Sequence, residues 1–442
     1  MKIKDILKIC DGTLICGDED AIINDFSKDT RTIKEGDLYV GIKGENYDGN
    51  IFYLEALNKG ATACILDNES VITTKDKNII LVKDSVEALH KLAEYKREQH
   101  NVKVIAVTGS VGKTTTKELI YNMLKDNYKV LKTDKNYNGQ IGLPLTVLKL
   151  NDEEILLVEM GMNEKGGIDK LSKIVKPDIA VITNIGTSHI GNLGSREEIM
   201  NAKLEILNHM HKDGILIINN DNDLLNKKKN SLNHKIITYG INNKSDYNAY
   251  DIKLEENKTT YKLNDEYYEI NISGLSTVYN SLVSIIIGDL FDIKDKKEKI
   301  KNIEIENNRL EIKNINNIKI IDDTYNASYE SIVNAIDMLK IIGKKRKIIV
   351  LGDVLELGTY SKQIHEEIGL YLRDIDILIT IGKESIYINN KANTKEKYHF
   401  YNLEDAYNKL KEIIKEEDTI LFKASHSMNF KELVSKLENS IN

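Results

Sequence analysis

The segment Val104 to Lys117, VIAVTGSVGKTTTK, constrains the fold of this 442-residue chain more than any other segment. A run of apolar residues leads into a turn that contains two glycines, and Lys113 and three threonines follow at once. This order predicts a buried strand, a tight turn and the start of a helix, with backbone amides that face an anion. The chain is therefore expected to bind phosphate at this turn.

Each residue type in the turn has an expected role in holding a nucleotide. Gly109 and Gly112 allow the backbone to approach phosphate closely. Lys113 neutralises the terminal phosphates, Thr114 offers a hydroxyl to Mg²⁺, and Thr115 adds a phosphate contact. The predicted nucleotide-binding residues of the turn are Thr108, Gly109, Ser110, Val111, Gly112, Lys113, Thr114 and Thr115.

Apolar, strand-like runs alternate with helix-like segments along most of the chain. After the phosphate-binding turn come EILLVEMG, DIAVITNIG and GILIINND, and later IKIIDD, KRKIIVLGD, DILITIG and DTILFKAS. Strands joined by crossover helices form parallel sheets. We therefore expect an α/β fold with two doubly wound sheets, preceded by a small α/β domain in which the apolar runs are shorter.

The length suggests about three domains at roughly 150 residues each. We place them at residues 1–100, 101–305 and 306–442. The first boundary follows a helical pattern over Val86 to Gln99, and the second follows Asp292 to Lys301, which fits a linker and a solvated helix equally well. The Lys- and Asn-rich pieces Asn226 to Asn233 and Asn389 to Lys397 are expected to be exposed turns.

Composition narrows the classes of function. The 62 Lys and Arg against 69 Asp and Glu leave a net charge of −7, so the chain lacks the basic excess that favours nucleic acid. Three cysteines without a CxxC pair argue against a disulfide framework or a thiolate zinc site. No apolar run approaches the ~18 residues of a membrane span, and the first residues lack the apolar centre of a secretory signal. We expect a cytoplasmic protein without membrane insertion.

Other strand ends are expected beside the phosphate-binding turn, because ligands of parallel sheets gather at the carboxyl ends of strands. Glu159 ends the run EILLVEMG and is a candidate Mg²⁺ ligand. His189 follows DIAVITNIG, where a site residue and an ordinary surface histidine are equally consistent with the sequence. Spacing alone makes Lys203 a solvated helix lysine.

The tetrapeptide NKSD, Asn243 to Asp246, matches the guanine-reading pattern NKxD. A guanine-nucleotide switch also needs a DxxG sequence that senses the γ-phosphate, and none follows the phosphate-binding turn. A P-loop GTPase is therefore the weaker alternative.

Taken together, these stretches resemble the Mur ligases of peptidoglycan synthesis, which are ATP-dependent amide-bond-forming enzymes of three domains. The resemblance spans essentially the whole chain and is closest to the branch that adds D-alanyl-D-alanine. It is carried by VTGSVGKTTTKE, whose family form also lacks the glycine that the general pattern has at Val107, and by EMGMNEKGGI, NIGTSHIGNLGS and VLGDVLELG. It implies a central P-loop parallel sheet, a C-terminal Rossmann-like doubly wound sheet and a small N-terminal α/β domain.

The resemblance implies a UDP-sugar site in the N-terminal domain. The stretch Phe26 to Gly49 is similar to the family's uridine-nucleotide-binding segment, and Asn50 stands where these enzymes commonly have His. The residues that match its binding elements are Thr30, Arg31, Lys43 and Gly44.

In the central domain, the resemblance implies two Mg²⁺ ions and a carbamylated Lys203. Carbamylation turns a cation into an oxygen-bearing anion, which suits a hard metal ion. Asn138, in NYNGQIGLPLT, matches an Asn near the reacting groups. The implied metal ligands are Thr114, Glu159, His189 and Lys203. The implied catalytic residues are Lys113, Asn138, His189 and Lys203.

Towards the C-terminus, Asn280 matches an adenine-side Asn of the family, and Arg309 and Asp323 match ATP-binding residues. Tyr325 and Asn326 fall on the side of the incoming dipeptide. The chain departs from the family pattern at Ser276, Thr277, Ser328, Tyr329, Ala424 and His426.

The resemblance implies that ATP activates the tripeptide carboxylate of UDP-N-acetylmuramoyl-tripeptide as an acyl phosphate, which the D-alanyl-D-alanine amine then attacks. It also implies closure of the domains, and we expect a monomer that binds no nucleic acid. A third-residue-adding Mur enzyme and a folylpolyglutamate synthetase-like ligase share the P-loop and the fold, and they remain alternatives.

Overall fold

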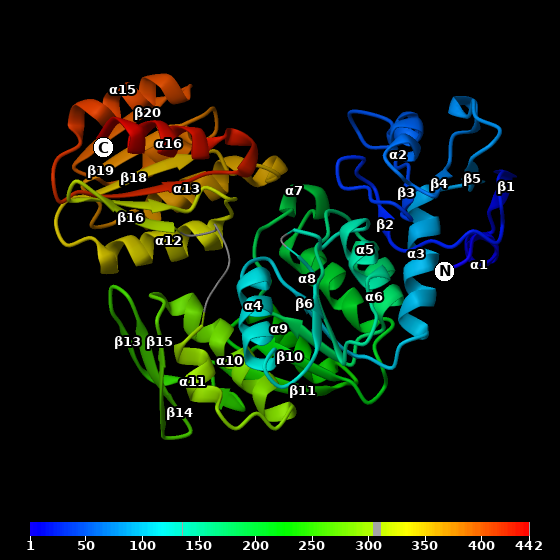
Figure 1. Ribbon diagram of the computed structural model, residues 1–442. Coiled ribbons are helices and arrows are strands. Elements are labelled where there is room, and N and C mark those ends of the chain that lie inside the picture. Colours follow the sequence, from blue (N-terminus) through cyan, green and yellow to red (C-terminus); the bar gives the residue numbers. More distant parts are fainter. Residues whose placement is uncertain (135, 304–310, 442) are drawn as a thin grey trace.

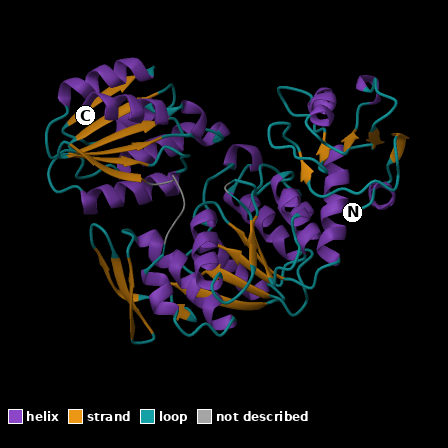
Figure 2. Ribbon diagram, viewed as in Figure 1, coloured by secondary structure: helices purple, strands orange, loops and turns teal. Residues whose placement is uncertain are grey.

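The computed structural model describes residues 1–134, 136–303 and 311–441, and in these residues the strands form four sheets. Figure 1 shows the N-terminal elements and the C-terminal elements on opposite sides of a central body. Helices flank the larger sheets (Figure 2). The expected boundary at residues 100 and 101 falls between a helix and a strand, whereas the one at residues 305 and 306 lies outside the described residues.

The N-terminal sheet has the order β1-β5-β4-β3-β2, with β1 antiparallel to β5 and the other pairs parallel. Its elements are α1 (Ile3–Cys10), β1 (Thr13–Cys16), β2 (Phe26–Ser27), β3 (Leu38–Val40), α2 (Tyr53–Asn58), β4 (Ala63–Leu66), β5 (Asn78–Leu81) and α3 (Ser85–Glu98). The Asp84 carboxylate caps α3 by accepting the N–H groups of Val86 and Glu87. Because α3 packs against α1 and also against two helices of the central body, it joins the two parts.

The central sheet contains seven parallel strands in the order β12-β11-β10-β9-β6-β8-β7. Its strands are β6 (Lys103–Thr108), β7 (Val130–Lys132), β8 (Ile155–Glu159), β9 (Ile179–Ile182), β10 (Ile215–Asn219), β11 (Lys235–Gly240) and β12 (Tyr247–Asn248). The helices around it are α4 (Lys113–Leu124), α5 (Gly142–Leu148), α6 (Gly167–Val175), α7 (Ile190–Leu193), α8 (Arg196–Leu204), α9 (Asp223–Lys228), α10 (Leu275–Leu290) and α11 (Lys296–Lys301).

Alternate residues of the central strands pack into two different cores. Along β6, Val104 and Ala106 belong to the core on the side of α5 and α6, whereas Ile105 and Val107 belong to the core on the side of α4 and α10. This period of two follows from strand geometry, and burial on both faces explains why the sequence shows an unbroken apolar run. It places the phosphate-binding turn at the carboxyl edge of a buried central strand.

A small antiparallel sheet, which the sequence analysis did not predict, follows the central sheet. Its strands are β13 (Tyr250–Leu254), β14 (Thr259–Leu263) and β15 (Glu266–Ile270), in the order β13-β14-β15. Tyr261 stacks on Tyr268 with ring centroids 5.6 Å apart, and the Tyr261 hydroxyl lies 2.7 Å from that of Ser281 on α10. At the turn before β14, Glu256 pairs with Lys319 and Lys344 of the C-terminal part.

The C-terminal sheet has the order β16-β17-β21-β18-β19-β20, in which β16 alone is antiparallel to its neighbour among the described strands. Its strands are β16 (Glu311–Ile315), β17 (Ile318–Asp322), β18 (Lys347–Gly352), β19 (Ile377–Ile381), β20 (Glu396–Phe400) and β21 (Thr419–Lys423). Its helices are α12 (Tyr329–Ile342), α13 (Ser361–Tyr371), α14 (Ile386–Lys391), α15 (Leu403–Ile413) and α16 (Phe430–Ile441). Two cores on opposite faces of β18 make this the expected doubly wound sheet.

Two segments differ from their predicted turns. Asn226 to Asn233 contains the end of α9 and a further short helical turn, because Asn222 caps α9 and the buried Leu224 and Leu225 anchor it. Asn389 to Lys397 contains the end of α14 and the start of β20.

The charged stretch Asp292 to Lys301 ends in α11, whose Ile300 is fully buried. No helix in the described ranges is long and apolar enough to cross a membrane.

Candidate active site

A cleft of about 1200 Å³ opens where the carboxyl ends of the central strands face the C-terminal sheet. Glu45 of the N-terminal part also lines it, next to the predicted Lys43 and Gly44. The structure therefore gathers at one cleft residues that are hundreds of positions apart. The predicted site residues that line it are Ser110, Val111, Gly112, Lys113, Thr115, Asn138, Glu159, His189, Lys203, Asn280, Asp323, Tyr325 and Asn326. Arg309 lies outside the described residues.

The phosphate-binding turn has the backbone that the sequence predicts. Gly109 and Gly112 have φ of +151° and +86°, and α4 begins at Lys113. A Cβ atom on Gly109 would lie 1.9 Å from Oγ1 of Thr183, so close packing also requires glycine there. The Lys113 ammonium donates to the Gly109 carbonyl over 2.9 Å, which folds its side chain back over the turn.

Asn184 is a site residue that the sequence analysis missed. Its side-chain oxygen accepts the N–H groups of Ser110 at 3.1 Å and Val111 at 2.9 Å. These are amides of the turn that would otherwise face an anion. Asn184 follows β9, which pairs with β6, so adjacent strand ends were the available signal.

Thr114, Glu159 and Asn138 form a hydrogen-bonded group beside the turn, in which Thr114 and Glu159 are buried and Asn138 is half-buried. The Thr114 hydroxyl donates to Oε2 of Glu159 at 2.7 Å, and the Asn138 amide donates to Oε1 at 2.7 Å. Glu159 is fully buried at the end of β8. Both of its oxygens are thus fixed at the cleft.

His189 joins the central body to the C-terminal sheet. Its Nδ1 atom lies 2.6 Å from Oε2 of Glu356, and its backbone has a φ of +64°. Burial lowers the pKa of His189, although Glu356 opposes this effect. The imidazole is therefore biased towards its neutral form, in which a ring nitrogen can bind a metal.

Lys203 on α8 is 2% exposed and lines the cleft. It makes no hydrogen bond or ion pair with any residue in the described ranges. Burial, together with the charge of Lys113, lowers its pKa well below the usual value for lysine. The prediction of a solvated helix lysine from spacing alone is wrong, because α8 turns this side chain into the cleft.

A second missed residue, Asp221, lines the cleft together with Tyr279 and Asn280. Burial acts to raise its pKa, but the N–H groups of Asn242, Ile241 and Asn243 outweigh this effect and hold the pKa below its usual value. The Tyr279 hydroxyl donates to Asp221 at 2.8 Å. Asn280 lies across from it, where its Oδ1 atom accepts the Thr116 hydroxyl at 3.2 Å.

The NKSD tetrapeptide does not take part in the cleft, although Asp221 holds the loop that contains it. Asp246 accepts the backbone N–H and the hydroxyl of Thr238, at 2.8 and 2.7 Å. The described residues that line the cleft include none of Asn243 to Asp246. The position of the NKSD tetrapeptide therefore does not support a role in reading a guanine base.

The C-terminal wall of the cleft contains an ion pair and an aromatic pair. Lys423 is 2% exposed and lies 2.5 Å from the Asp323 carboxylate, and it also donates to the Asn326 carbonyl at 3.0 Å. The rings of Tyr325 and His426 lie 5.8 Å apart. Lys423, which the sequence analysis missed, holds the chain turn that presents these groups.

The predicted UDP-sugar residues lie at the surface of the N-terminal part. Thr30 donates to Glu55 at 2.8 Å, and Arg31 pairs with Asp29 at 2.6 Å while its side chain stays 84% exposed. Lys43 forms a backbone bridge with Asp48, and the Gly44 N–H donates to the Tyr47 carbonyl. This turn positions Glu45 at the cleft.

The donor chemistry of the cleft fits Mg²⁺ only in part. The described residues contain no group of three or more His, Cys, Asp or Glu side chains that could hold a metal. Thr114 and Glu159 provide two hard oxygen donors, and the phosphates of a nucleotide would supply more. A carbamate on Lys203 would add oxygen donors on the side of His189.

Three family models match the chain. The Mur ligase family catalytic domain matches residues 25–97, the Mur ligase middle domain 107–288, and the Mur ligase glutamate ligase domain 308–426. The chain belongs to the Mur ligase family, and it is an ATP-dependent ligase.

Within the family, several relatives at 30% to 38% identity share one name. The UDP-N-acetylmuramoyl-tripeptide–D-alanyl-D-alanine ligase of Bacillus subtilis is 38% identical, over 99% of this chain and 98% of its own length. A crystal structure of MurF from Acinetobacter baumannii has a TM-score of 0.91 at 28% identity, covering 99% of this chain and 98% of that one. MurF from Thermotoga maritima, solved with ADP, has a TM-score of 0.85 at 31% identity, covering 96% and 99%.

Proposed function

We propose that the chain uses ATP to join D-alanyl-D-alanine to UDP-N-acetylmuramoyl-tripeptide in peptidoglycan precursor synthesis. The single observation that carries the proposal is one cleft lined by the phosphate-binding turn, by the C-terminal sheet and by Glu45 of the N-terminal part. An ATP-dependent ligase must bring ATP, an acid and an amine together, and each of the three parts of the chain contributes residues to the lining of this cleft. The name that the relatives at 30% or more identity share supplies the identity of the substrates.

Each part of the chain has a proposed task. Residues 1–100 hold the UDP-sugar through Thr30, Arg31, Lys43 and Gly44. Residues 101–305 bind ATP at the turn and at Asn280, and residues 306–442 complete the nucleotide site through Asp323. The dipeptide binds at Tyr325 and Asn326. All of these residues come from one chain, so a monomer suffices.

The residues around the turn suit activation of a carboxylate by phosphoryl transfer. Lys113 holds the terminal phosphates and offsets the charge that spreads over them as the tripeptide carboxylate attacks the γ-phosphate. ADP leaves and an acyl phosphate remains, which the dipeptide amine attacks with loss of phosphate. Asn138 keeps Glu159 oriented throughout.

Two Mg²⁺ ions, when bound, would stabilise the negative charge of the phosphates. Thr114 and Glu159 would hold one ion, and His189 with a carbamylated Lys203 would hold the second. Carbamylation requires a neutral amine, and Lys203 is buried without a hydrogen-bond partner among the described residues. The chemistry that supports this modification is that the unmodified side chains of His189 and Lys203 offer no oxygen donor, whereas a carbamate on Lys203 would.

The acyl phosphate hydrolyses in water, so the cleft must close around it. The C-terminal sheet already contacts the loop that follows β9 through Glu330 and Glu356. ATP dependence and three free cysteines are consistent with a cytoplasmic location.

An ADP-release assay with purified chain tests the proposal. ADP should form only when ATP, UDP-N-acetylmuramoyl-tripeptide and D-alanyl-D-alanine are all present, and mass spectrometry should show the pentapeptide product. ATP hydrolysis that ignores both other substrates would overturn the proposal. The related ligases are tested in the same assay, by replacing the tripeptide nucleotide with the dipeptide nucleotide or by supplying a folate and glutamate. The GTPase alternative is tested by competition between nucleotides, and it would be supported if GTP displaced ATP preferentially.

A further inference from the structure

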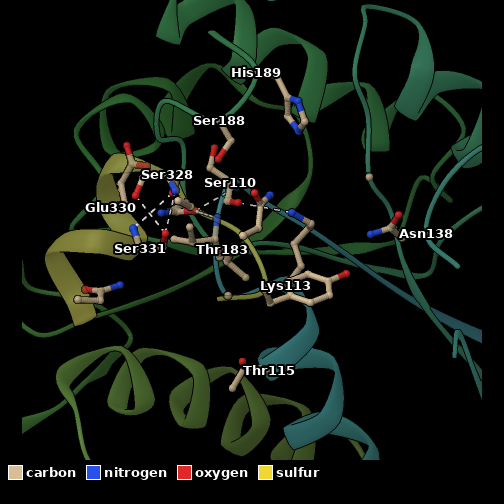
Figure 3. A pocket seen from close by; sticks show the side chains of 18 of the residues that line it. Ser110, Lys113, Thr115, Asn138, Thr183, Ser188, His189, Ser328, Glu330 and Ser331 are labelled. Atoms are coloured by element: carbon tan, nitrogen blue, oxygen red, sulfur yellow. Dashed lines mark hydrogen bonds between the residues drawn. The ribbon is translucent and has the colours of Figure 1, made fainter. Parts of the chain in front are cut away.

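The side chain of Glu330 connects the C-terminal sheet to the phosphate-binding turn through two successive hydrogen-bond steps. Glu330 lies in the first turn of α12, and its carboxylate accepts the Thr187 N–H at 2.7 Å and the Thr187 hydroxyl at 3.2 Å. The preceding residue, Gly186, donates its N–H to Oγ of Ser110 at 2.9 Å. Figure 3 shows Glu330 directed at the same part of the cleft as Ser110.

Gly186 allows this contact because it lacks a side chain. A Cβ atom there would lie 2.4 Å from the carboxyl carbon of Glu330 and 2.5 Å from one of its oxygens. Gly186 is not among the glycines with positive φ, so its backbone conformation does not itself require glycine. Alanine at this position would displace the Glu330 carboxylate and leave the backbone conformation accessible.

The far end of the same loop is held by different contacts. The Gly191 N–H donates to the Glu356 carbonyl at 2.9 Å, and the Tyr360 hydroxyl donates to the Gly194 carbonyl at 2.7 Å. These contacts fix the C-terminal sheet to the loop, but they lie beyond His189 in the sequence. Glu330 holds the first part of the loop, at Thr187, next to the Gly186 N–H that contacts Ser110.

We infer that Glu330 is a positioning residue that fixes the C-terminal sheet relative to the phosphate-binding turn, and thereby sets the spacing between the dipeptide and the acyl phosphate. The inference rests on the proposed function for its kinetic part only. The contact needs hydrogen-bond acceptors and no negative charge. A glutamine could accept the Thr187 N–H with its oxygen and donate its amide to the Thr187 hydroxyl.

The kinetic test compares Glu330→Gln, Glu330→Ala and Gly186→Ala. We expect Glu330→Gln to stay within about twofold of the parent in kcat, and the other two to lose about tenfold, the order of one buried hydrogen bond. The KM for D-alanyl-D-alanine should rise in these two, while the KM for ATP stays within about twofold. Glu366→Ala on α13 is the matched control, because Glu366 makes no hydrogen bond or ion pair within the described ranges.

A distance measurement tests the same inference without any substrate. Nitroxide labels on Lys149→Cys and Lys391→Cys, in a Cys16→Ser background, report the separation of the central body from the C-terminal sheet by double electron–electron resonance. We expect Glu330→Ala and Gly186→Ala to broaden the distance distribution and Glu330→Gln to keep it narrow. An unchanged distribution in Glu330→Ala would overturn the inference whichever substrates the chain joins. Loss of kcat in Glu330→Gln equal to that in Glu330→Ala would also overturn it, because the charge would then be required.

Discussion

The Thr114 hydroxyl donates a 2.7 Å hydrogen bond to Oε2 of Glu159, and this contact joins the first turn of α4 to the end of β8. The two residues are 45 positions apart: Thr114 lies on the helix that follows β6, and Glu159 ends β8, which pairs with β6 in parallel. Both are almost fully buried, so their oxygens are oriented before a nucleotide binds. A preorganised pair of oxygen donors costs little reorganisation when charge develops.

Replacing Glu159 with Gln should therefore impair use of Mg²⁺ specifically. The amide keeps the volume and one acceptor but loses the charge, so we expect kcat to fall about 100-fold. The measurement is ADP release against Mg²⁺ concentration, in which the half-saturating concentration should rise. Glu153→Gln, before the amino end of β8, is the control and should behave as the parent. An unchanged Mg²⁺ dependence in Glu159→Gln would remove Glu159 from the metal site.

Replacing Lys203 with Ala should abolish ligation, because no amine remains to carry a carbamate. We expect a loss of at least about 100-fold in kcat that high bicarbonate does not restore. A small carboxylate such as acetate can enter the space left by the side chain and should restore part of the activity. Lys212→Ala, an exposed lysine beyond α8, should have no effect. Full activity in Lys203→Ala would disprove the assigned role.

The sequence predicted those parts of the cleft that depend on a single strand and the turn after it. The apolar run of β6 had to be buried, and the residues after it had to emerge at the carboxyl edge. The same reasoning located Glu159 at the end of β8. His189 and Lys203 needed the family resemblance, because a loop His and a helix Lys carry no periodic signal that distinguishes a site from a surface.

The missed residues act across contacts that only the folded chain defines. Asn184 binds amides of the turn more than 70 positions earlier, and Lys423 pairs with Asp323 100 positions earlier. Neither pairing leaves a local pattern. The strands β13 to β15 were missed because charged and polar residues separate the apolar positions there, so that no apolar run marks the buried residues. The buried residues of β14 and β15 include Tyr261, Leu263, Tyr268 and Ile270.

Replacing His426 with Ala should weaken binding of the dipeptide more than that of ATP. His426 is exposed on the C-terminal wall of the cleft, beside Tyr325, where it can face the carboxylate of the incoming dipeptide. We expect the KM for D-alanyl-D-alanine to rise about tenfold, with the KM for ATP within about twofold. His426→Arg should lower the dipeptide KM relative to His426→Ala. Equal dipeptide KM values in the parent and His426→Ala would exclude this residue from dipeptide binding.

The stability of the C-terminal sheet should fall as the pH drops below about 6.5, the ordinary pKa of histidine. His365 is fully buried; its Nε2 atom accepts the Val354 N–H at 3.0 Å, and its Nδ1 atom lies 2.7 Å from the Ser361 carbonyl. Nδ1 must donate and Nε2 must accept, so this geometry requires the neutral ring. Burial lowers the pKa of His365, against the smaller opposing effect of the Ser361 carbonyl.

The sign of this effect follows from proton binding. Between the ordinary pKa and the lowered pKa of the folded state, the unfolded chain binds a proton at His365 that the folded chain does not. Acid therefore favours unfolding in that range, by at most about 1.4 kcal/mol at pH 5.5. The measurement is the urea midpoint at pH 7.5 and at pH 5.5, for the parent and for His365→Gln. The variant should be less stable at pH 7.5 and should lose less stability on acidification. An equal loss in both proteins would mean that another group, such as the half-buried His90, whose pKa is also lowered by desolvation, accounts for the acid sensitivity.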